Sequence, residues 1–224
     1  LDWVPEFAEA HSNLGLLLQA RGQWADAEQC YRAAITLQPD AATPHYNLGV
    51  CLKAQHQPAA AEAAFREALR RQPDLHSALL NLDRVLQDQG RAVESESYWR
   101  EALRLRPDFV AGYQHLAAVL RQQQRNEEAL ACLHQALALE PDNLSLLHAA
   151  AGVQRSLHRM DEAEALCRRA LELAPDAASA WVHLAGVLNA GQRLVEAEAG
   201  YRRAIALDPQ LAAAHANLGI VLQN

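Results

Sequence analysis

Apolar and small residues recur along this chain at the spacing of amphipathic helices. From Ala8 to about Arg21, leucine and small residues fall at positions i, i+3, i+4 and i+7, and the same spacing returns from Ala25 to Gln38. Residues at this spacing share one face of an α-helix. Gly22 interrupts the pattern and Pro39 ends it. The pattern therefore predicts two amphipathic helices joined by a short turn.

This helical hairpin is repeated every 34 residues. Seven of the nine prolines mark the period: Pro5, Pro39, Pro73, Pro107, Pro141, Pro175 and Pro209. A fixed period of this length is typical of a solenoid, in which each unit buries its apolar face against its neighbours. Proline disfavours helix in the residue before it, so each proline should end a second helix. The Asp that follows it in five of the six units is expected to cap the next helix.

The period fixes the expected boundaries of the helices and of the repeats. First helices are expected at 8–21, 42–55, 76–89, 110–123, 144–157, 178–191 and 212–224, and second helices at 25–38, 59–72, 93–106, 127–140, 161–174 and 195–208. Residues 1–7 match the end of a unit, so we expect the chain to open inside a repeat. We predict a single array over 1–224, with complete repeats at 8–41, 42–75, 76–109, 110–143, 144–177 and 178–211 and the first helix of a further repeat at 212–224.

Four positions counted back from each closing proline predict the core. Twenty-five residues before it stand Leu14, Leu48, Leu82, Leu116, Ala150 and Leu184, with Leu218 at the same place in the last unit. Twelve residues before it stand Ala27, Ala61, Ser95, Ala129, Ala163 and Ala197; five before it stand Ala34, Ala68, Ala102, Ala136, Ala170 and Ala204; eight before it stand Tyr31, Phe65, Trp99, Leu133, Cys167 and Tyr201. Small residues let neighbouring helices approach closely, and the bulky residues fill the space between units. The fifth unit departs from its neighbours at Ala150, Gln154 and Cys167, which predicts either a local repacking or a softer joint.

Small residues, glycine, an aromatic residue and proline at a spacing of 34 resemble the tetratricopeptide repeat, and the resemblance covers nearly the whole chain. The resemblance implies an all-α fold: a right-handed superhelical α-solenoid of antiparallel helix pairs. It also implies that the first helices line a concave face and that the chain is a protein–protein interaction module.

One row of the first helices is polar although it adjoins the core leucines. Twenty-six residues before each proline, and at the same place in the last unit, stand Asn13, Asn47, Asn81, His115, Ala149, His183 and Asn217, here called the amide row. An Asn side chain both donates and accepts, so it can pair with the backbone of an extended peptide. The row resembles that of the tetratricopeptide domain of O-GlcNAc transferases, which implies a role in holding substrate polypeptide. The resemblance fails at Ala149, and the alternative is that these side chains are solvated or tie helix to helix.

A second row lies twenty residues before each proline and adds positive charge to the same groove. It consists of Gln19, Lys53, Gln87, Arg121, Arg155, Asn189 and Gln223. With Arg84 nearby, this row predicts a mildly basic surface that favours acidic or hydroxyl-rich segments. Ordinary exposed helix residues would give the same pattern. The Lys, Asn and Arg set with which other tetratricopeptide domains clamp a C-terminal carboxylate is not reproduced, which disfavours the binding of chaperone tails.

Composition narrows the class of partner and compartment. The formal net charge is −7 and the pI is near 5.8, which argues against a nucleic-acid or anionic-membrane surface. The sequence contains neither an apolar run long enough to span a membrane nor a secretory leader pattern. Cys30, Cys51, Cys132 and Cys167 form no CxxC pair, so we expect buried thiols in a reducing, cytoplasmic setting. Richness in Ala, Arg and Gln is typical of bacterial proteins.

No residue pattern assigns catalysis or a cofactor to this chain. HExxH, G-x-S-x-G and glycine-rich phosphate-binding motifs are all missing from the sequence. His11, His45 and His215 occupy equivalent places in different repeats, too far apart to share one metal ion. We therefore expect a non-enzymatic region without metal or cofactor, although a catalytic domain fused to it in a longer protein is compatible with the sequence.

Three classes of function remain at this stage. The first is a module that binds an extended peptide, as the substrate-recruiting N-terminal region of a bacterial enzyme like the O-GlcNAc transferases. Its expected binding residues are Asn13, Asn47, Asn81, His115, His183, Asn217, Lys53, Arg84, Arg121 and Arg155. The second is a structural scaffold that forms homo-oligomers through uncapped ends. The third, a reader of single-stranded RNA, is disfavoured by the acidic charge.

Overall fold

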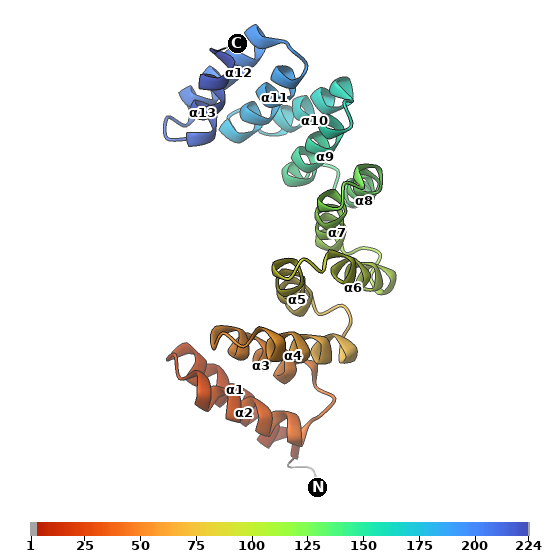
Figure 1. Ribbon diagram of the computed structural model, residues 1–224, viewed down its shortest axis with the longest axis vertical. Coiled ribbons are helices and arrows are strands. Elements are labelled where there is room, and N and C mark those ends of the chain that lie inside the picture. Colours follow the sequence, from red (N-terminus) through yellow and green to blue (C-terminus); the bar gives the residue numbers. More distant parts are fainter. Residues whose placement is uncertain (1–3, 224) are drawn as a thin grey trace. The chain divides into compact units, whose positions relative to one another are not determined.

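The computed structural model describes residues 4–223, which form thirteen α-helices and no strands (Figure 1). The first helices of the pairs are α1 Val4–Ala20, α3 Ala42–Ala54, α5 His76–Asp88, α7 Val110–Gln122, α9 Leu144–Ser156, α11 Ala178–Ala190 and α13 Ala212–Val221. The second helices are α2 Trp24–Leu37, α4 Pro58–Arg71, α6 Ala92–Leu105, α8 Asn126–Leu139, α10 Met160–Leu173 and α12 Leu194–Leu207. Consecutive helices pack as antiparallel pairs, which confirms the predicted all-α fold.

The predicted helix boundaries are close, with one exception at the start of the chain. Each second helix begins and ends one residue earlier than expected. Helix α1 begins at Val4 rather than at residue 8, and the assignment of residues 1–7 to the end of a repeat stays a prediction. Proline is tolerated in a first turn because the N–H it lacks would have no partner there. Part of that range, Leu1 to Trp3, lies outside the described residues, as does Asn224.

The turn inside each hairpin has the same backbone geometry in all six pairs. Gly22 and Gly90 have φ of 73° and 71°, and four residues other than glycine have φ of 59° to 63° at the equivalent places: His56, Gln124, His158 and Gln192. In the first pair, the N–H of Gln23 donates to the carbonyl of Leu18 at 2.9 Å. This bond is typical of the motif that closes a helix with one left-handed residue.

Each second helix ends before its proline, as the proline rule requires, whereas the predicted Asp caps are wrong. The residue before each proline has ψ of 77° to 94°, outside the helical range. The N-cap of the next helix lies two residues after the proline, at Ala41, Leu75, Phe109, Asn143, Ala177 or Leu211. The Asp therefore stands one residue too early to cap. Of these six, only Asn143 caps with its side chain, accepting from the N–H of Leu146 at 3.2 Å.

The predicted small and bulky rows are buried, whereas the predicted leucine row is wrong at Leu14, which is 47% exposed. Leu48 and Leu218 of the same row are half-buried. Every residue of the two small rows is at most 1% exposed, and every residue of the bulky row is at most 2% exposed. Glycines provide further room in the first two pairs: a Cβ on Gly15 would lie 2.6 Å from the ring of Tyr31, and one on Gly49 would lie 2.5 Å from that of Phe65. These aromatic rings therefore pack directly on the backbone of α1 and α3.

In the fifth unit, the three residues that differ from the repeat pattern lie in the core. Ala150 and Cys167 are fully buried, and Gln154 is 7% exposed. Burial raises the pKa of the Cys167 thiol to about 11. The expectation of four buried thiols holds for Cys51 and Cys167, whereas Cys30 and Cys132 are half-buried. That this unit is a softer joint stays a prediction.

Contacts divide the chain into two compact units, one ending at Pro107 and the other beginning at Asp108. Arginines tie successive second helices together inside each unit. In the first, Arg91 donates to Glu62 in α4 at 2.9 Å, and in the second, Arg193 donates to Glu164 in α10 at 2.6 Å. The single array over 1–224 stays a prediction. None of the described helices is both long enough and apolar enough to cross a membrane.

Candidate functional site

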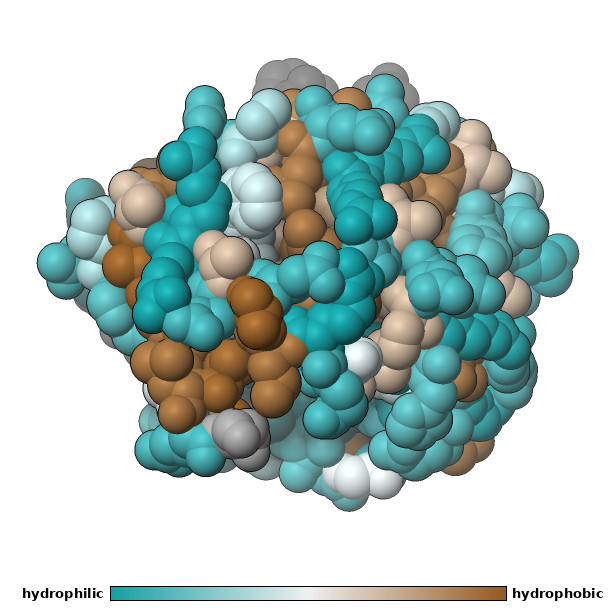
Figure 2. Space-filling model, turned by 90° about the horizontal axis from the view of Figure 1, so that it is seen from above, coloured by the Kyte–Doolittle hydropathy of each residue, from teal (hydrophilic) through white to brown (hydrophobic). Residues whose placement is uncertain are grey.

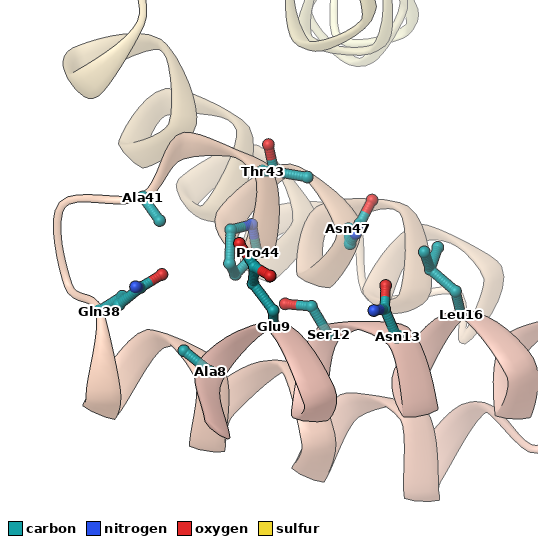
Figure 3. A pocket seen from close by; sticks show the side chains of 10 residues that line it. All are labelled: Ala8, Glu9, Ser12, Asn13, Leu16, Gln38, Ala41, Thr43, Pro44 and Asn47. Atoms are coloured by element: carbon teal, nitrogen blue, oxygen red, sulfur yellow. The ribbon is translucent and has the colours of Figure 1, made fainter. Parts of the chain in front are cut away.

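A hollow of about 340 Å³ lies between α1 and α3, where two members of the amide row face the same space (Figure 3). Asn13 comes from α1 and Asn47 from α3, and the connection from α2 to α3 closes one end with Gln38 and Ala41. The lining, here called the α1–α3 hollow, consists of Ala8, Glu9, Ser12, Asn13, Leu16, Gln38, Ala41, Thr43, Pro44 and Asn47.

The helical spacing explains why polar groups gather in this hollow. Glu9 and Asn13 are four residues apart in α1, and Thr43 and Asn47 are four residues apart in α3, so each pair shares one helix face. Asn13 is exposed, whereas Asn47 is only 7% exposed. The hollow therefore presents one accessible amide and one amide near its floor.

The polar side chains of this hollow have no partner among residues 7–223, the part of the chain with described side chains. These side chains make neither hydrogen bonds nor ion pairs within that range. They belong to Glu9, Ser12, Asn13, Gln38, Thr43 and Asn47. An amide of this kind can still donate one pair of N–H groups and accept at its oxygen. A shallow site with several unused donors and acceptors can bind a polar backbone.

Asn81, the next member of the row, is occupied by the protein itself. Lys53 Nζ donates to Asn81 Oδ1 at 3.0 Å, and Asn81 Nδ2 donates to the carbonyl of Ser77 at 2.9 Å. Lys53 thus links α3 to α5 across one repeat. Lys53 and Asn81 were both predicted to bind peptide. Instead they contact each other, which agrees with the alternative that residues of this row tie helix to helix.

In the second compact unit one member of the amide row, His183, packs against a histidine outside the row, His148. The ring of His183 in α11 stacks on that of His148 in α9, with centroids 4.2 Å apart and planes 23° apart. Desolvation of the packed rings is the main cause that lowers both pKa values, that of His148 to about 4. Arg155 also lowers the pKa of His183, and its guanidinium lies 3.1 Å from where a Cβ on Gly186 would stand.

The remaining predicted residues are dispersed. Arg121 lines a separate hollow of about 460 Å³ with Ala118, Gln122, Gln124, Asn126 and Ser156. Arg84 is exposed on α5, while His115 and Asn217 are half-buried on α7 and α13. The structure therefore brings together Asn13 with Asn47, Lys53 with Asn81, and Arg155 with His183.

The histidines considered as metal ligands have a structural environment instead. Nε2 of His45 lies 3.1 Å from the carbonyl oxygen of Pro39, and Nε2 of His215 lies 3.0 Å from that of Pro209. Trp181, at the equivalent place, donates from Nε1 to the carbonyl of Pro175 at 3.0 Å. In these three units the residue at this position ties the start of the first helix to the preceding proline. Within the described part of the chain, no three His, Cys, Asp or Glu side chains are grouped to hold a metal ion.

Family models described as tetratricopeptide repeat match residues 6–74, residues 52–108 and 153–212, and residues 110–143. One of them alone spans more than half of the chain. The chain belongs to the tetratricopeptide repeat family. A search of curated protein sequences finds no match.

Solved structures of other tetratricopeptide repeat proteins share the fold. The structure titled "Functional Characterization of Pseudomonas Aeruginosa pilF" is 20% identical with a TM-score of 0.69, covering 97% of this chain and 99% of its own. YrrB, described as a TPR protein with an unusual peptide-binding site, is 20% identical with a TM-score of 0.64, covering 84% and 97%. TTC0263 from Thermus thermophilus is 26% identical with a TM-score of 0.61, covering 82% and 100%.

The tetratricopeptide repeat pattern did not reveal every residue of the hollow. Glu9, Ser12 and Thr43 were not among the predicted binding residues because they fall outside the amide row. The spacing of four residues between Glu9 and Asn13 is the signal that would have found the most important of them.

Proposed function

We propose that this chain binds an extended peptide segment along the groove of its first helices, centred on the α1–α3 hollow. The observation that carries the proposal is the pair of amides, Asn13 and Asn47, which face one hollow without partners among the described residues. Each can donate to a peptide carbonyl and accept from a peptide N–H without reading side chains. The repeat family supports a protein-interaction role, and one structural neighbour is described as having a peptide-binding site.

Within this proposal, the chain is the substrate-recruiting region of a bacterial enzyme like the O-GlcNAc transferases. The amide row carries that idea, since asparagine recurs at four of its seven places. The row is not uniform, because Asn81 is held by Lys53 and His183 stacks on His148. We therefore propose that peptide backbone is gripped first at Asn13 and Asn47, and that the other places contribute side-chain contacts.

Substitution of the two amides tests this function. Binding of a library of unstructured peptides is measured by fluorescence anisotropy for the full chain, for N13A, for N47A and for the double variant. Loss of each amide should cost about 1 kcal/mol of binding free energy net, so the double variant should bind about tenfold to thirtyfold more weakly. Gln29→Ala, an exposed amide on α2 outside the hollow, is the matched control. Equal binding by the double variant and this control would contradict the proposal.

The exposed apolar side chains of α1 favour a second candidate, a scaffold that self-associates. Leu17 is 62% exposed, whereas the residues at the equivalent place in the next five units, Cys51, Val85, Val119, Val153 and Val187, are at most 6% exposed. Ile220 near the end of α13 is 54% exposed, and Leu222, which directly follows the helix, is 58% exposed. The view of the C-terminal end in Figure 2 shows apolar residues gathered on one side. Sedimentation velocity tests the candidate: association that Leu17→Lys reduces supports it, and a strict monomer at all concentrations rejects it.

A further inference from the structure

The α1–α3 hollow contains one charged group, the carboxylate of Glu9. The other polar lining residues, Ser12, Asn13, Gln38, Thr43 and Asn47, are uncharged. Figure 3 shows the Glu9 side chain reaching into the hollow beside Pro44 and next to Ser12. Among residues 7–223, whose side chains the structure describes, Glu9 has neither a hydrogen-bond donor nor a cationic partner. The hollow therefore carries one uncompensated negative charge beside the two amides.

This carboxylate is a departure from the repeat. The residues at the equivalent place in the other units are small: Thr43, Ser77, Ala111, Ser145, Ser179 and Ala213. The helix does not need an acid at this place, since none of the other six first helices has one. The nearby basic groups Lys53 and Arg71 are directed elsewhere, the first to Asn81 and the second to Glu67 and the carbonyl of Pro39.

The shape and the walls of the hollow suit a long cationic side chain. A volume of about 340 Å³ lies at the lower end of the range for ligand sites. Ala8, Leu16 and Pro44 give it apolar walls, against which the methylene groups of a lysine or arginine can pack while the charged end meets a carboxylate. An acidic side chain would be repelled at the same place.

We infer that the α1–α3 hollow selects a lysine or arginine residue of the bound segment, an inference that rests on the proposed function. Asn13 and Asn47 hold the backbone of that residue, and Glu9 pairs with its ammonium or guanidinium group. This contact fixes the register of the segment on the groove, because only this hollow has a carboxylate at that place in the repeat. The bound partner is thus an extended peptide with a basic residue at one defined position.

A positional peptide array tests the inference with the full chain. Unstructured twelve-residue peptides of neutral background carry Lys, Arg, norleucine or Glu at each position in turn, and binding is measured for the wild type, Glu9→Gln, Glu9→Lys and Asp26→Asn. Asp26 is an exposed carboxylate on α2, outside the hollow, so Asp26→Asn is the matched loss of one negative charge. Norleucine keeps the apolar stem of lysine and removes its charge.

At one position, the wild type and Asp26→Asn should bind the Lys or Arg peptide about fivefold more tightly than the norleucine peptide, as expected for a partly exposed ion pair. Glu9→Gln should remove this preference without weakening norleucine binding, and Glu9→Lys should favour Glu. Peptide binding without any basic preference, or a preference that persists in Glu9→Gln, overturns the inference and leaves the proposed function standing. Failure to bind any peptide overturns both.

Discussion

Gly49 offers a direct test of how the aromatic residues pack between helices. We predict that Gly49→Ala destabilises the protein, although alanine is the better helix former, because its methyl group would stand 2.5 Å from Cε1 of Phe65. Gly152→Ala, in the interior of α9, places the same methyl group where nothing lies within 4 Å. The same substitution should therefore have opposite effects at the two sites.

The expected magnitudes follow from the contacts. Ordinary carbon contacts are about 3.5–4.0 Å, so the new methyl group is about 1 Å too close to a ring that is fully buried and cannot move into solvent. Overpacking of this kind costs about 1–3 kcal/mol, and the gain in helix propensity offsets about 0.5–1 kcal/mol. We expect Gly49→Ala to lose about 1–2 kcal/mol of unfolding free energy and Gly152→Ala to gain about 0.5–1 kcal/mol.

Urea unfolding followed by circular dichroism measures both variants against the wild type. The fourth unit supplies a rescue, since Ala117 stands at the place of Gly49 and Leu133 at the place of Phe65. In a Phe65→Leu background, Gly49→Ala should therefore cost less than in the wild type, with a coupling of about 1 kcal/mol in a double-mutant cycle. A Gly49→Ala variant that is as stable as Gly152→Ala would refute this reasoning.

Three further predictions concern single residues. His56→Gly should stabilise the protein by about 0.5–1 kcal/mol in urea unfolding, because a left-handed backbone costs residues other than glycine about 1–2 kcal/mol and the greater freedom of unfolded glycine returns part of it; a loss of stability would contradict this. The folded-state pKa of His148, lowered to about 4 from the ordinary 6.5, means that the unfolded chain binds the proton first as pH falls. Unfolding free energy should thus decrease from about pH 6.5 to pH 4, by less in His148→Gln than in a control variant of the exposed His134. Under native conditions Cys167, with its pKa raised to about 11, should react with a thiol reagent far more slowly than half-buried Cys30, and equal rates would show that the core around Cys167 opens readily.

The repeat made most of the fold predictable. Core positions recur every 34 residues because each unit packs on its neighbour in the same way, so burial of Ala34 implies burial of Ala68 and the rest of that row. The Asp caps were mispredicted because the turn after the proline takes one more residue than a simple cap requires. The left-handed residues were not anticipated at His56 or Gln124, since nothing in those side chains marks the conformation.

The candidate site was predictable only in part, because its members obey no shared packing constraint. The spacing of the amide row puts Asn13 and Asn47 in successive first helices, and both side chains line the α1–α3 hollow. The sequence does not show that Lys53 donates a hydrogen bond to Asn81, because the two residues are 28 positions apart and meet only when α3 packs against α5. Glu9 was not predicted because an acid occurs at this place in one unit only, and the repeat identifies only residues that recur.

Asn81 and Asn47 differ in the residue that lies twenty before the proline in the preceding unit. For Asn81 that residue is Lys53, whose long stem spans to the next first helix and donates to the amide oxygen. For Asn47 it is Gln19, which is shorter and instead accepts a hydrogen bond from the hydroxyl of Tyr31 at 2.9 Å. Gln19 is therefore hydrogen-bonded to Tyr31 in the core and does not donate to Asn47 as Lys53 donates to Asn81. Core packing, through Tyr31, is in this way coupled to the opening of the α1–α3 hollow.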